Sequence, residues 1–306
     1  MAYTNFPAGI TSFGVPIFGG PLVPAGNVYW VKKTTDSDYD EFKEERFTTY
    51  TDGTNSIYNT IQAAVTAATS GRGDIIYVLP GEYDEDITHT KTFLRIVGVG
   101  SRHSVRITGT SAGTKTAMTL SGVQDAGLYN LNLEGRTSSG SALVLTGQNR
   151  RIEVLGCKIH GGDSAIKIAV PTGAQTVDVR FEDNIIANSA IGLFVDYSGG
   201  DPCHQIHIKN NTFSKITTDC IVEDGATHDW QIFGNYFTAS DGTEPTQFLD
   251  IDETGSTGFV ANNFFATTIF STAKFAIATG VLFANNISEA ENPSAAVGGT
   301  SGRPDA

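Results

Sequence analysis

Five short segments decide the fold of this 306-residue chain: VRFEDNII (179–186), IHIKNNTF (206–213), WQIFGNYF (230–237), GFVANNFF (258–265) and VLFANNIS (281–288). Aligning Asn184, Asn211, Asn235, Asn263 and Asn286 gives spacings of 27, 24, 28 and 23 residues. Cys157, in IEVLGCKI (152–159), takes the same place one repeat earlier. A period of about 25 residues is typical of folds in which one structural unit stacks on the next.

The residues around each asparagine alternate as they do in a strand. Positions five and three residues before it, and two residues after it, are apolar in almost every repeat. Leucine-rich repeats have a similar period, but their L-x-x-L-x-L run is absent, and propeller blades need about 40 residues or more. The pattern predicts an all-β solenoid of about eight coils with parallel pairing between coils. The asparagines are expected to form a structural column, because asparagine tolerates left-handed backbone and its amide can bond to the next coil.

The segment TNFPAGITSFGVPIFGGPLVPAG (4–26) has a different character. Its prolines and glycines are too frequent for a helix, and its large apolar side chains would not stay solvated as a free linker. We expect residues 1–50 to be an extended arm and a charged loop, with the arm docking on a partner. Packing against its own β-helix is the alternative. The docking residues are expected to be Phe6, Ile10, Phe13, Val15, Ile17, Phe18, Leu22 and Val23.

Residues 51–290 are expected to form the β-helix, preceded by a capping helix at about 55–70. The helix is indicated by an apolar stripe at helical spacing: Ile57, Ile61, Ala64, Val65 and Ala68. Asn55 or Ser56 is expected to cap its start and Gly71 to end it. Residues 291–306 have the composition of a flexible tail.

The stretches TIQAAVTAA (60–68), GDIIYVLPGEY (73–83) and LRIVGVG (94–100) resemble the capped start of the pectin-lyase-like superfamily. That resemblance covers residues 54–290 and implies a single-stranded right-handed parallel β-helix with an N-terminal capping helix. It does not define an activity, because the fold hosts lyases, hydrolases, adhesins and structural parts. TNFPAGITSFGVPI with GNVYWV resembles the N-termini of tailed-bacteriophage virion proteins and implies a head decoration (cement) protein, head spike or tail spike.

The composition argues against several partners. With 20 basic and 33 acidic residues the formal charge is −13, which repels nucleic acid and anionic membranes. No apolar run is long enough to span a bilayer, and the N-terminus lacks the pattern of a signal peptide. We therefore expect a protein made in the host cytoplasm and localised to the virion. Cys157, Cys203 and Cys220 are expected to be reduced thiols.

Catalytic candidates are few. If the strands of CIVEDG (220–225) and FLDIDE (248–253) stack, Glu223, Asp250 and Asp252 become neighbours, and two carboxylates can act as acid and nucleophile. A solvated acidic face is the simpler interpretation, so no catalytic residue is expected. Cys203, His204 and His207 lack a second ligand pair, and we expect no metal site and no cofactor.

The outward positions beside the asparagine column become apolar towards the C-terminus. Phe233, Tyr236, Phe264 and Ile287 are therefore candidates for a subunit interface. The resemblance to phage β-helix proteins implies a homotrimer joined there. Cover by the chain's own loops or arm is one alternative. Another is that Tyr236 and Phe264 stack on a host surface glycan.

These observations lead to one main functional hypothesis. It is a non-enzymatic virion structural protein, a trimeric decoration or cement protein whose arm binds the major capsid protein or another virion protein. The alternatives are a tailspike-like polysaccharide-degrading enzyme and a glycan-binding adhesin that leaves its ligand intact.

Overall fold

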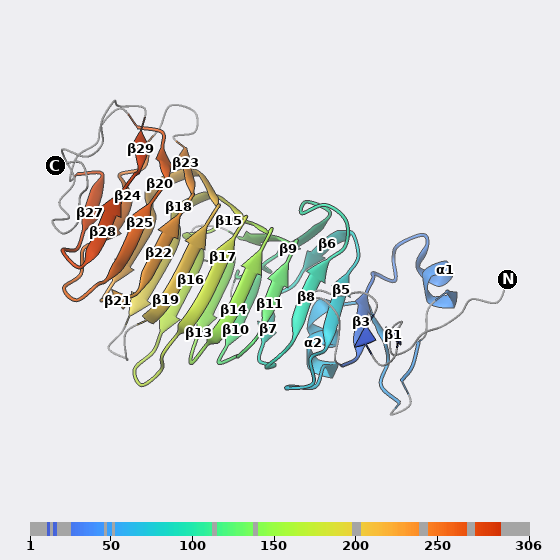
Figure 1. The fold of residues 1–306 in the computed structure, drawn as a ribbon. Helices are drawn as coiled ribbons and strands as arrows, with labels where there is room; N and C mark the ends of the chain where they lie inside the picture. The colour runs from blue at the N-terminus through green and yellow to red at the C-terminus, as the bar shows by residue number, and fades with distance from the viewer. Residues whose placement is uncertain are drawn as a thin grey trace.

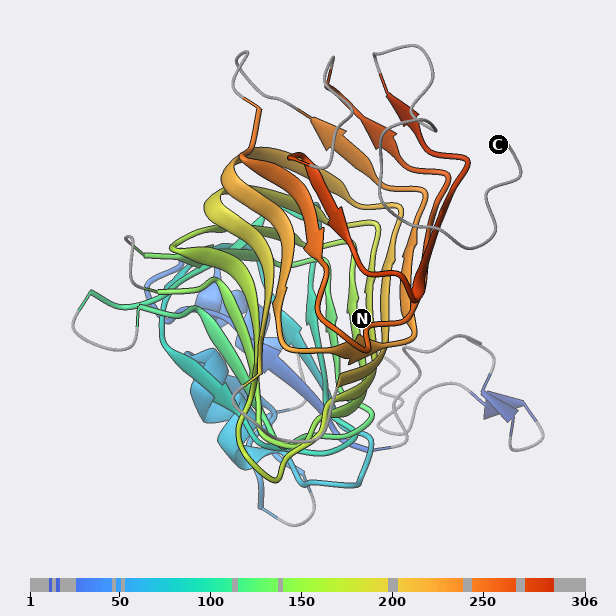
Figure 2. The ribbon, with the colours of Figure 1, turned by 90° about the vertical axis from the view of Figure 1, so that its left-hand side faces the viewer.

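The computed structural model describes residues 11–12, 15–16, 26–45, 48–50, 53–111, 115–136, 140–197, 203–238, 244–267 and 273–288. They form an elongated right-handed parallel β-helix, which confirms the predicted fold class (Figure 1). The coils stack behind one another when the molecule is viewed from its last coils (Figure 2). It has about nine turns, one more than expected.

Most of the predicted arm lies outside the described residues, namely Phe6, Ile10, Phe13, Ile17, Phe18, Leu22 and Val23. Val15 belongs to a short antiparallel pair, β1 (Thr11–Ser12) with β2 (Val15–Pro16). The predicted tail, 291–306, also lies outside the described residues.

The β-helix has three faces. The first face precedes the asparagine column and comprises β3 (Val28–Val31), β4 (Ile57–Tyr58), β5 (Ile75–Val78), β8 (Arg95–Gly98), β11 (Gly127–Tyr129), β14 (Arg150–Leu155), β17 (Val177–Glu182), β19 (Cys203–Lys209), β21 (Thr227–His228), β22 (Trp230–Phe233), β25 (Gly258–Ala261) and β28 (Val281–Ala284). All the pairs between neighbouring strands of this face are parallel.

The second face follows the column, and the third closes each coil. The second comprises β6 (Gly81–Asp84), β9 (Val105–Thr108), β12 (Asn132–Gly135), β15 (Lys158–Gly161), the first halves of β18 (Ile185–Tyr197) and β20 (Thr212–Asp224), β23 (Tyr236–Thr238), β26 (Phe264–Phe265) and β29 (Ile287–Ser288). The third comprises β7 (Ile87–His89), β10 (Met118–Ser121), β13 (Leu143–Thr146), β16 (Ser164–Val170), the second halves of β18 and β20, β24 (Gln247–Ile251) and β27 (Phe275–Ile277).

The core is built from ladders of like side chains, because parallel in-register pairing places equivalent residues of successive coils above one another. The rings of Phe213, Phe237 and Phe265 are fully buried and stack with centroid distances of 4.7 and 4.6 Å. Phe248 and Phe275 form a second stack beside them, at 5.7 Å. Such offset stacks add to the free energy gained from burying the aromatic surface.

The asparagine column is a hydrogen-bonded ladder at the corner between the first and second faces. Each side-chain amide donates to Oδ1 of the next asparagine at 2.9–3.1 Å, from Asn184 through to Asn286. The backbone N–H of each donor asparagine bonds to the same oxygen. Cys157 ends the column, since its backbone N–H donates to Asn184 Oδ1 at 2.8 Å. These bonds satisfy polar groups that burial would otherwise penalise.

The chain turns the corner at the residue before each column asparagine. Asp183, Asn210, Gly234, Asn262 and Asn285 have φ angles between 53° and 67°. This left-handed region is accessible mainly to Gly, Asn and Asp, which explains the Asn-Asn, Asp-Asn and Gly-Asn doublets of the repeat. The column asparagines were expected to have the left-handed backbone conformation. The residue before each of them has it instead.

The first coils differ from the predicted boundaries. β3 pairs with β4 and β5, so the β-helix already begins at Val28, within the segment assigned to the arm and loop. A short helix, α1 (Tyr39–Glu44), lies in the connection that follows. The capping helix α2 (Ile61–Ala67) is shorter than 55–70, because residues 57–58 are used in β4.

The ends of α2 also differ from those expected. Thr60, rather than Asn55 or Ser56, is the N-cap, and its Oγ1 accepts from Ala63 N at 3.2 Å. Both oxygens of Glu85 accept from the first backbone N–H groups of the helix, at 3.0 Å. A carboxylate at this end is favoured by the helix dipole. The C-cap is Ala68, not Gly71.

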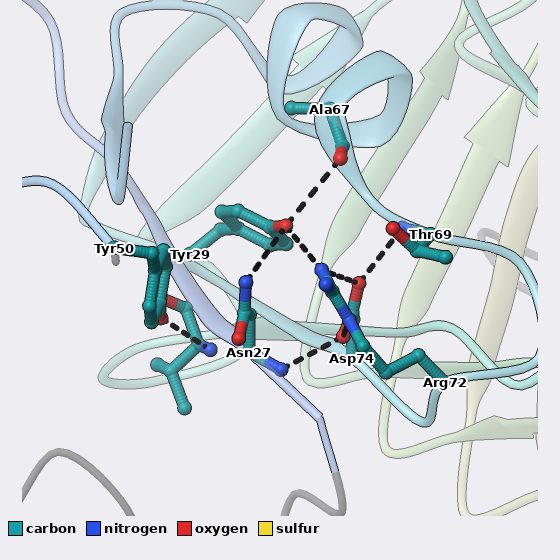
Figure 3. A network of polar contacts seen from close by, with 8 residues as sticks. Asn27, Tyr29, Tyr50, Ala67, Thr69, Arg72 and Asp74 are labelled. Atoms are coloured by element: carbon teal, nitrogen blue, oxygen red, sulfur yellow. Dashed lines mark hydrogen bonds and ion pairs between the residues drawn. The ribbon is translucent and has the colours of Figure 1, made fainter. Parts of the chain in front are cut away.

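A polar network ties this cap to the first strands (Figure 3). Asp74 is fully buried and accepts from the backbone N–H groups of Asn27 and Thr69, each at 2.8 Å. Arg72 reaches both oxygens of Asp74, at 2.6 and 2.8 Å, and also donates to the Tyr29 hydroxyl. The buried charge of Asp74 is thereby compensated by a cation and several donors.

Candidate functional site

Glu223, the first catalytic candidate, points into the core. Only 6% of the residue is exposed, Trp230 Nε1 donates to it at 2.9 Å, and Ser256 Oγ donates to it at 2.5 Å. Burial raises the pKa of this carboxyl to about 7, more than the hydrogen bonds lower it. Glu223 is therefore a polar group of the core and not part of an outer acidic face.

The predicted pairing of Glu223 with Asp250 is not formed. β20 and β24 do stack, but Asp250 lies opposite Val222, one residue before Glu223. Since successive residues of a strand point to opposite faces, the two carboxylates lie on opposite sides of the sheet. Asp252 follows the end of β24, and its negative charge raises the pKa of Asp250.

The outer side of the third face carries Asp250, and Asp219 lies on the neighbouring strand β20, opposite Gln247. Burial raises the pKa of Asp250, and the neighbouring charges of Asp252, Asp219 and Glu253 raise it further. Burial likewise raises the pKa of Asp219, and its Oδ1 has no hydrogen-bond partner within the described residues. A carboxyl group whose pKa is raised keeps its proton to a higher pH than a free carboxyl group does.

Asp219 is not singled out by the sequence. Cys220 and Ile221 after it are both buried, which marks a bend in β20 that alternation alone does not show. Two cations on this face are paired with other carboxylates: Lys167 with Asp196 at 2.7 Å, and Lys274 with Glu244 at 3.2 Å. Lys167 also lies over the ring of Phe194, with its ammonium 5.3 Å from the centroid.

The cysteine and histidine cluster does not converge on a metal. Cys203 is buried in the core, His204 packs against His228 with ring centroids 4.9 Å apart, and His207 bonds to Gln231. More generally, no group of three His, Cys, Asp or Glu in the described ranges is arranged to hold a metal ion. No helix among those residues is both long and apolar enough to cross a membrane.

Three of the four interface candidates form a single row, which we call the apolar row: Tyr236, Phe264 and Ile287, of which Phe264 is half-buried. They lie opposite one another on β23, β26 and β29, and the rings of Tyr236 and Phe264 stack at 4.9 Å. Tyr236 is 47% exposed and Ile287 is 63% exposed. Phe233 lies on the first face, on the other side of the corner, and is 37% exposed.

The first face carries two neighbouring hollows on its outer side. The smaller, of about 180 Å³, is lined mainly by charged groups that bond to one another. Arg151 pairs with Asp125 at 2.6 Å, Arg180 with Asp178 at 2.9 Å, and the Tyr129 hydroxyl with Glu153 at 2.6 Å. The larger, of about 360 Å³, contains Phe233 and several polar side chains.

Among solved structures, the chain is similar to pectin methylesterase from Aspergillus niger, with 19% identity, a TM-score of 0.51, and coverage of 86% of this chain and 89% of the other. Escherichia coli YbhC is 14% identical with a TM-score of 0.57, covering 94% and 90% of the two chains. Rice weevil pectin methyl esterase is 13% identical with a TM-score of 0.51, covering 89% and 99%.

These similarities establish the fold: the chain is a pectin-lyase-like right-handed β-helix. At such identities they do not carry over an activity. No family model matches the sequence, and no curated protein matches it.

Proposed function

We propose that this protein is a non-enzymatic structural component of a tailed-bacteriophage particle, a trimeric decoration or cement protein of the capsid. The observation that carries the proposal is the apolar row. Three large apolar side chains lie together on consecutive coils at one edge of a rigid scaffold, with Tyr236 and Ile287 exposed and Phe264 half-buried between them. Contiguous exposed apolar surface of this kind usually marks an association site.

A second copy of the chain is the proposed partner at this row. The protein carries a net charge of −13, which opposes self-association unless apolar contact offsets the repulsion. The stacked rings of Tyr236 and Phe264 offer a flat surface that is already ordered, so little side-chain entropy is lost on docking. The virion setting is supported by the resemblance of residues 4–31 to phage proteins.

The non-enzymatic assignment is supported by the arrangement of the carboxylates. Glu223 is enclosed by Trp230 and Ser256, and Asp250 faces the other side of the sheet. The predicted acid and nucleophile therefore cannot act on one substrate.

Sedimentation velocity of the full chain tests the association. The wild type is expected to sediment as a trimer, and the variant with Tyr236→Lys and Ile287→Lys as a monomer. Leu155→Lys is the matched control, because Leu155 is also an exposed apolar strand residue, at 37%, but lies on the first face. A wild type that stays monomeric at high micromolar concentration would contradict the proposed assembly.

Deletion of residues 2–25 tests the role of the arm. The shortened chain keeps Val28–Val31 and the Asn27 bond to Asp74, so it is expected to fold. It should no longer bind to phage heads that lack the native protein, whereas the full chain should bind them. Equal binding of both chains would show that the arm is not the anchor.

A polysaccharide-active enzyme is the second candidate, favoured by the raised pKa values of Asp219 and Asp250 on the third face. The similar structures named above include pectin methylesterases, so methyl-esterified pectin and host-envelope glycans are the substrates to try. Release of methanol or oligosaccharide, lost in Asp250→Asn, would support this candidate. Intact glycans after incubation with the wild type would reject it.

A further inference from the structure

The larger hollow on the first face, which we call the lateral hollow, crosses four neighbouring strands, β17, β19, β22 and β25. Its volume is about 360 Å³, and it is lined by Arg180, Glu182, His207, Lys209, Gln231, Phe233 and Phe259. It lies around the corner from the apolar row and does not share a residue with it. None of its residues takes part in the proposed association.

Strand register arranges the lining in two parallel rows that run along the axis of the β-helix. The first row is Arg180, His207, Gln231 and Phe259, each opposite the next. The second row is Glu182, Lys209 and Phe233. Neighbouring positions in a row are separated by the strand spacing of about 4.8 Å.

The first row forms a fixed floor. His207 Nδ1 and Gln231 Oε1 are 2.9 Å apart, and Arg180 Nε donates to Asp178 at 2.9 Å. These bonds hold the imidazole, the amide and the guanidinium in place before any ligand arrives. A site organised in this way loses less entropy on binding.

The second row carries polar groups that are uncommitted. Within the described residues, the Glu182 carboxylate and the Lys209 ammonium make no hydrogen bond or ion pair, and Gln231 Nε2 also has no acceptor. The hollow therefore offers an acceptor, a cationic donor and an amide donor. Glu182 and Lys209 have opposite charges, and Arg180 is paired with Asp178, so the site is close to neutral overall.

Phe233 supplies an apolar surface beside these groups. It is 37% exposed, and its neighbour on β25 is Ala261, whose small side chain leaves that side of the ring uncrowded. An aromatic ring flanked by hydrogen-bonding groups suits a sugar, whose C–H face packs on the ring while its hydroxyl groups bond at the edges.

We propose that the lateral hollow binds an extended, neutral, 1,4-linked polysaccharide whose chain runs along the axis of the β-helix. A sugar ring is similar in length to the strand spacing of about 4.8 Å, so successive sugars of an extended chain meet successive coils. Phe233 stacks on one sugar, and Lys209, Gln231 and Glu182 bond to hydroxyl groups. Polyanionic chains are disfavoured by the charge of −13.

Isothermal titration calorimetry with cellohexaose, mannohexaose, xylohexaose and hexagalacturonate tests the inference. The full chain should bind at least one of the three neutral hexasaccharides. Phe233→Ala should weaken that binding at least tenfold, and Lys209→Met about fivefold to tenfold. Tyr236→Ala is the matched control, since it removes an exposed aromatic ring on the second face. It should bind as the wild type does.

Several results would overturn the inference: no binding of any neutral hexasaccharide, undiminished binding by Phe233→Ala, an equal loss in Tyr236→Ala, or tightest binding of hexagalacturonate. Thermal melts of each variant show whether it is folded, and Lys209→Met, at an exposed position, keeps the test open should Phe233→Ala unfold. The variant with Tyr236→Lys and Ile287→Lys should bind sugar even as a monomer. Sugar binding and self-association can therefore fail independently.

Discussion

The side-chain amide of Asn211 donates to Oδ1 of Asn235 at 3.1 Å and to the backbone oxygen of Phe181 at 2.8 Å, so this one residue joins three coils. Its own Oδ1 accepts from the backbone N–H and the amide of Asn184. The bonds of the ladder run between coils, and they satisfy the polar groups that each turn between two faces leaves without a partner in its own coil.

Replacing Asn211 by alanine should lower the free energy of unfolding by about 3 kcal/mol. The reason is that several buried groups lose their partners, at about 1–3 kcal/mol for each group left unsatisfied. Urea denaturation measures the change. Asn210→Gly is the matched control, because Asn210 precedes the ladder and has a φ of 54°, which glycine adopts freely. A loss of similar size in Asn210→Gly would show that the turn, not the ladder, sets the stability.

Phe213→Ala should cost about 3–5 kcal/mol, as expected for a large buried aromatic residue that stacks on a neighbour. Phe213 is fully buried against Phe237, whereas Leu155 on the first face is 37% exposed and lies outside the apolar row. Leu155→Ala should therefore change stability by less than about 1 kcal/mol. Equal costs for the two variants, measured by chemical denaturation, would be incompatible with the inward ladder.

Glu223 should make the protein less stable as the pH rises. Its pKa is about 7 in the folded state against 4.5 for a free carboxyl, so the folded state binds the proton more tightly. The resulting stabilisation is complete below pH 4.5 and is lost as the pH passes through 7. At about 1.4 kcal/mol per pKa unit, the loss approaches about 3 kcal/mol.

The Glu223→Gln variant isolates this effect, because glutamine is neutral at every pH and similar in shape. Subtracting its unfolding free energy from that of the wild type at each pH should give a curve that falls between pH 4.5 and 7. At pH 8 the variant should be the more stable protein. A flat difference curve would mean that the carboxylate is ionised in the folded protein at little cost.

Arg72→Met should destabilise the cap by about 3 kcal/mol, because it leaves the fully buried Asp74 without its cation. Adding Asp74→Asn to Arg72→Met should restore part of that loss, since the buried charge is then removed as well. A double-mutant cycle followed by urea denaturation measures the coupling. Strictly additive losses would indicate that the pair in Figure 3 is not coupled.

All three thiols should be inert in the folded protein. Cys157, Cys203 and Cys220 are buried, and burial raises the pKa of both Cys157 and Cys203 to about 12. A disulfide reagent such as DTNB at pH 8 should therefore titrate no thiol until denaturant is added, and then three. Rapid reaction of one thiol in the native state would locate an opening in the core.

The repeat could be predicted from sequence because the ladder needs asparagine itself, at one place in each of five successive coils. The inward aromatic positions followed from the same alignment, as Phe213, Phe237 and Phe265 show. The capping helix was recognised from its apolar stripe, but its start was placed too early. Residues 57–58 pair with β3, and such a long-range pairing leaves no mark on helical periodicity.

The carboxylates could not be placed from sequence. Cys220 and Ile221 are consecutive buried residues, so the alternation in β20 changes phase just before Glu223 and turns it inward. The offset of Asp250 depends on the connection between β20 and β24, which differs in length from coil to coil. The local sequence pattern shows which residues form a coil. It does not show which of them point inward where a strand bends.

The asparagine ladder also has a direction, since four of its amides donate one proton to the asparagine of the coil that follows in the chain. During synthesis each finished coil therefore presents a waiting donor, and the next asparagine to emerge brings the matching oxygen. A chain built in this way can fold coil by coil from its N-terminus to its C-terminus during synthesis. A nascent fragment that stops early is left with an unpaired amide donor on its last coil, which can bond to another strand.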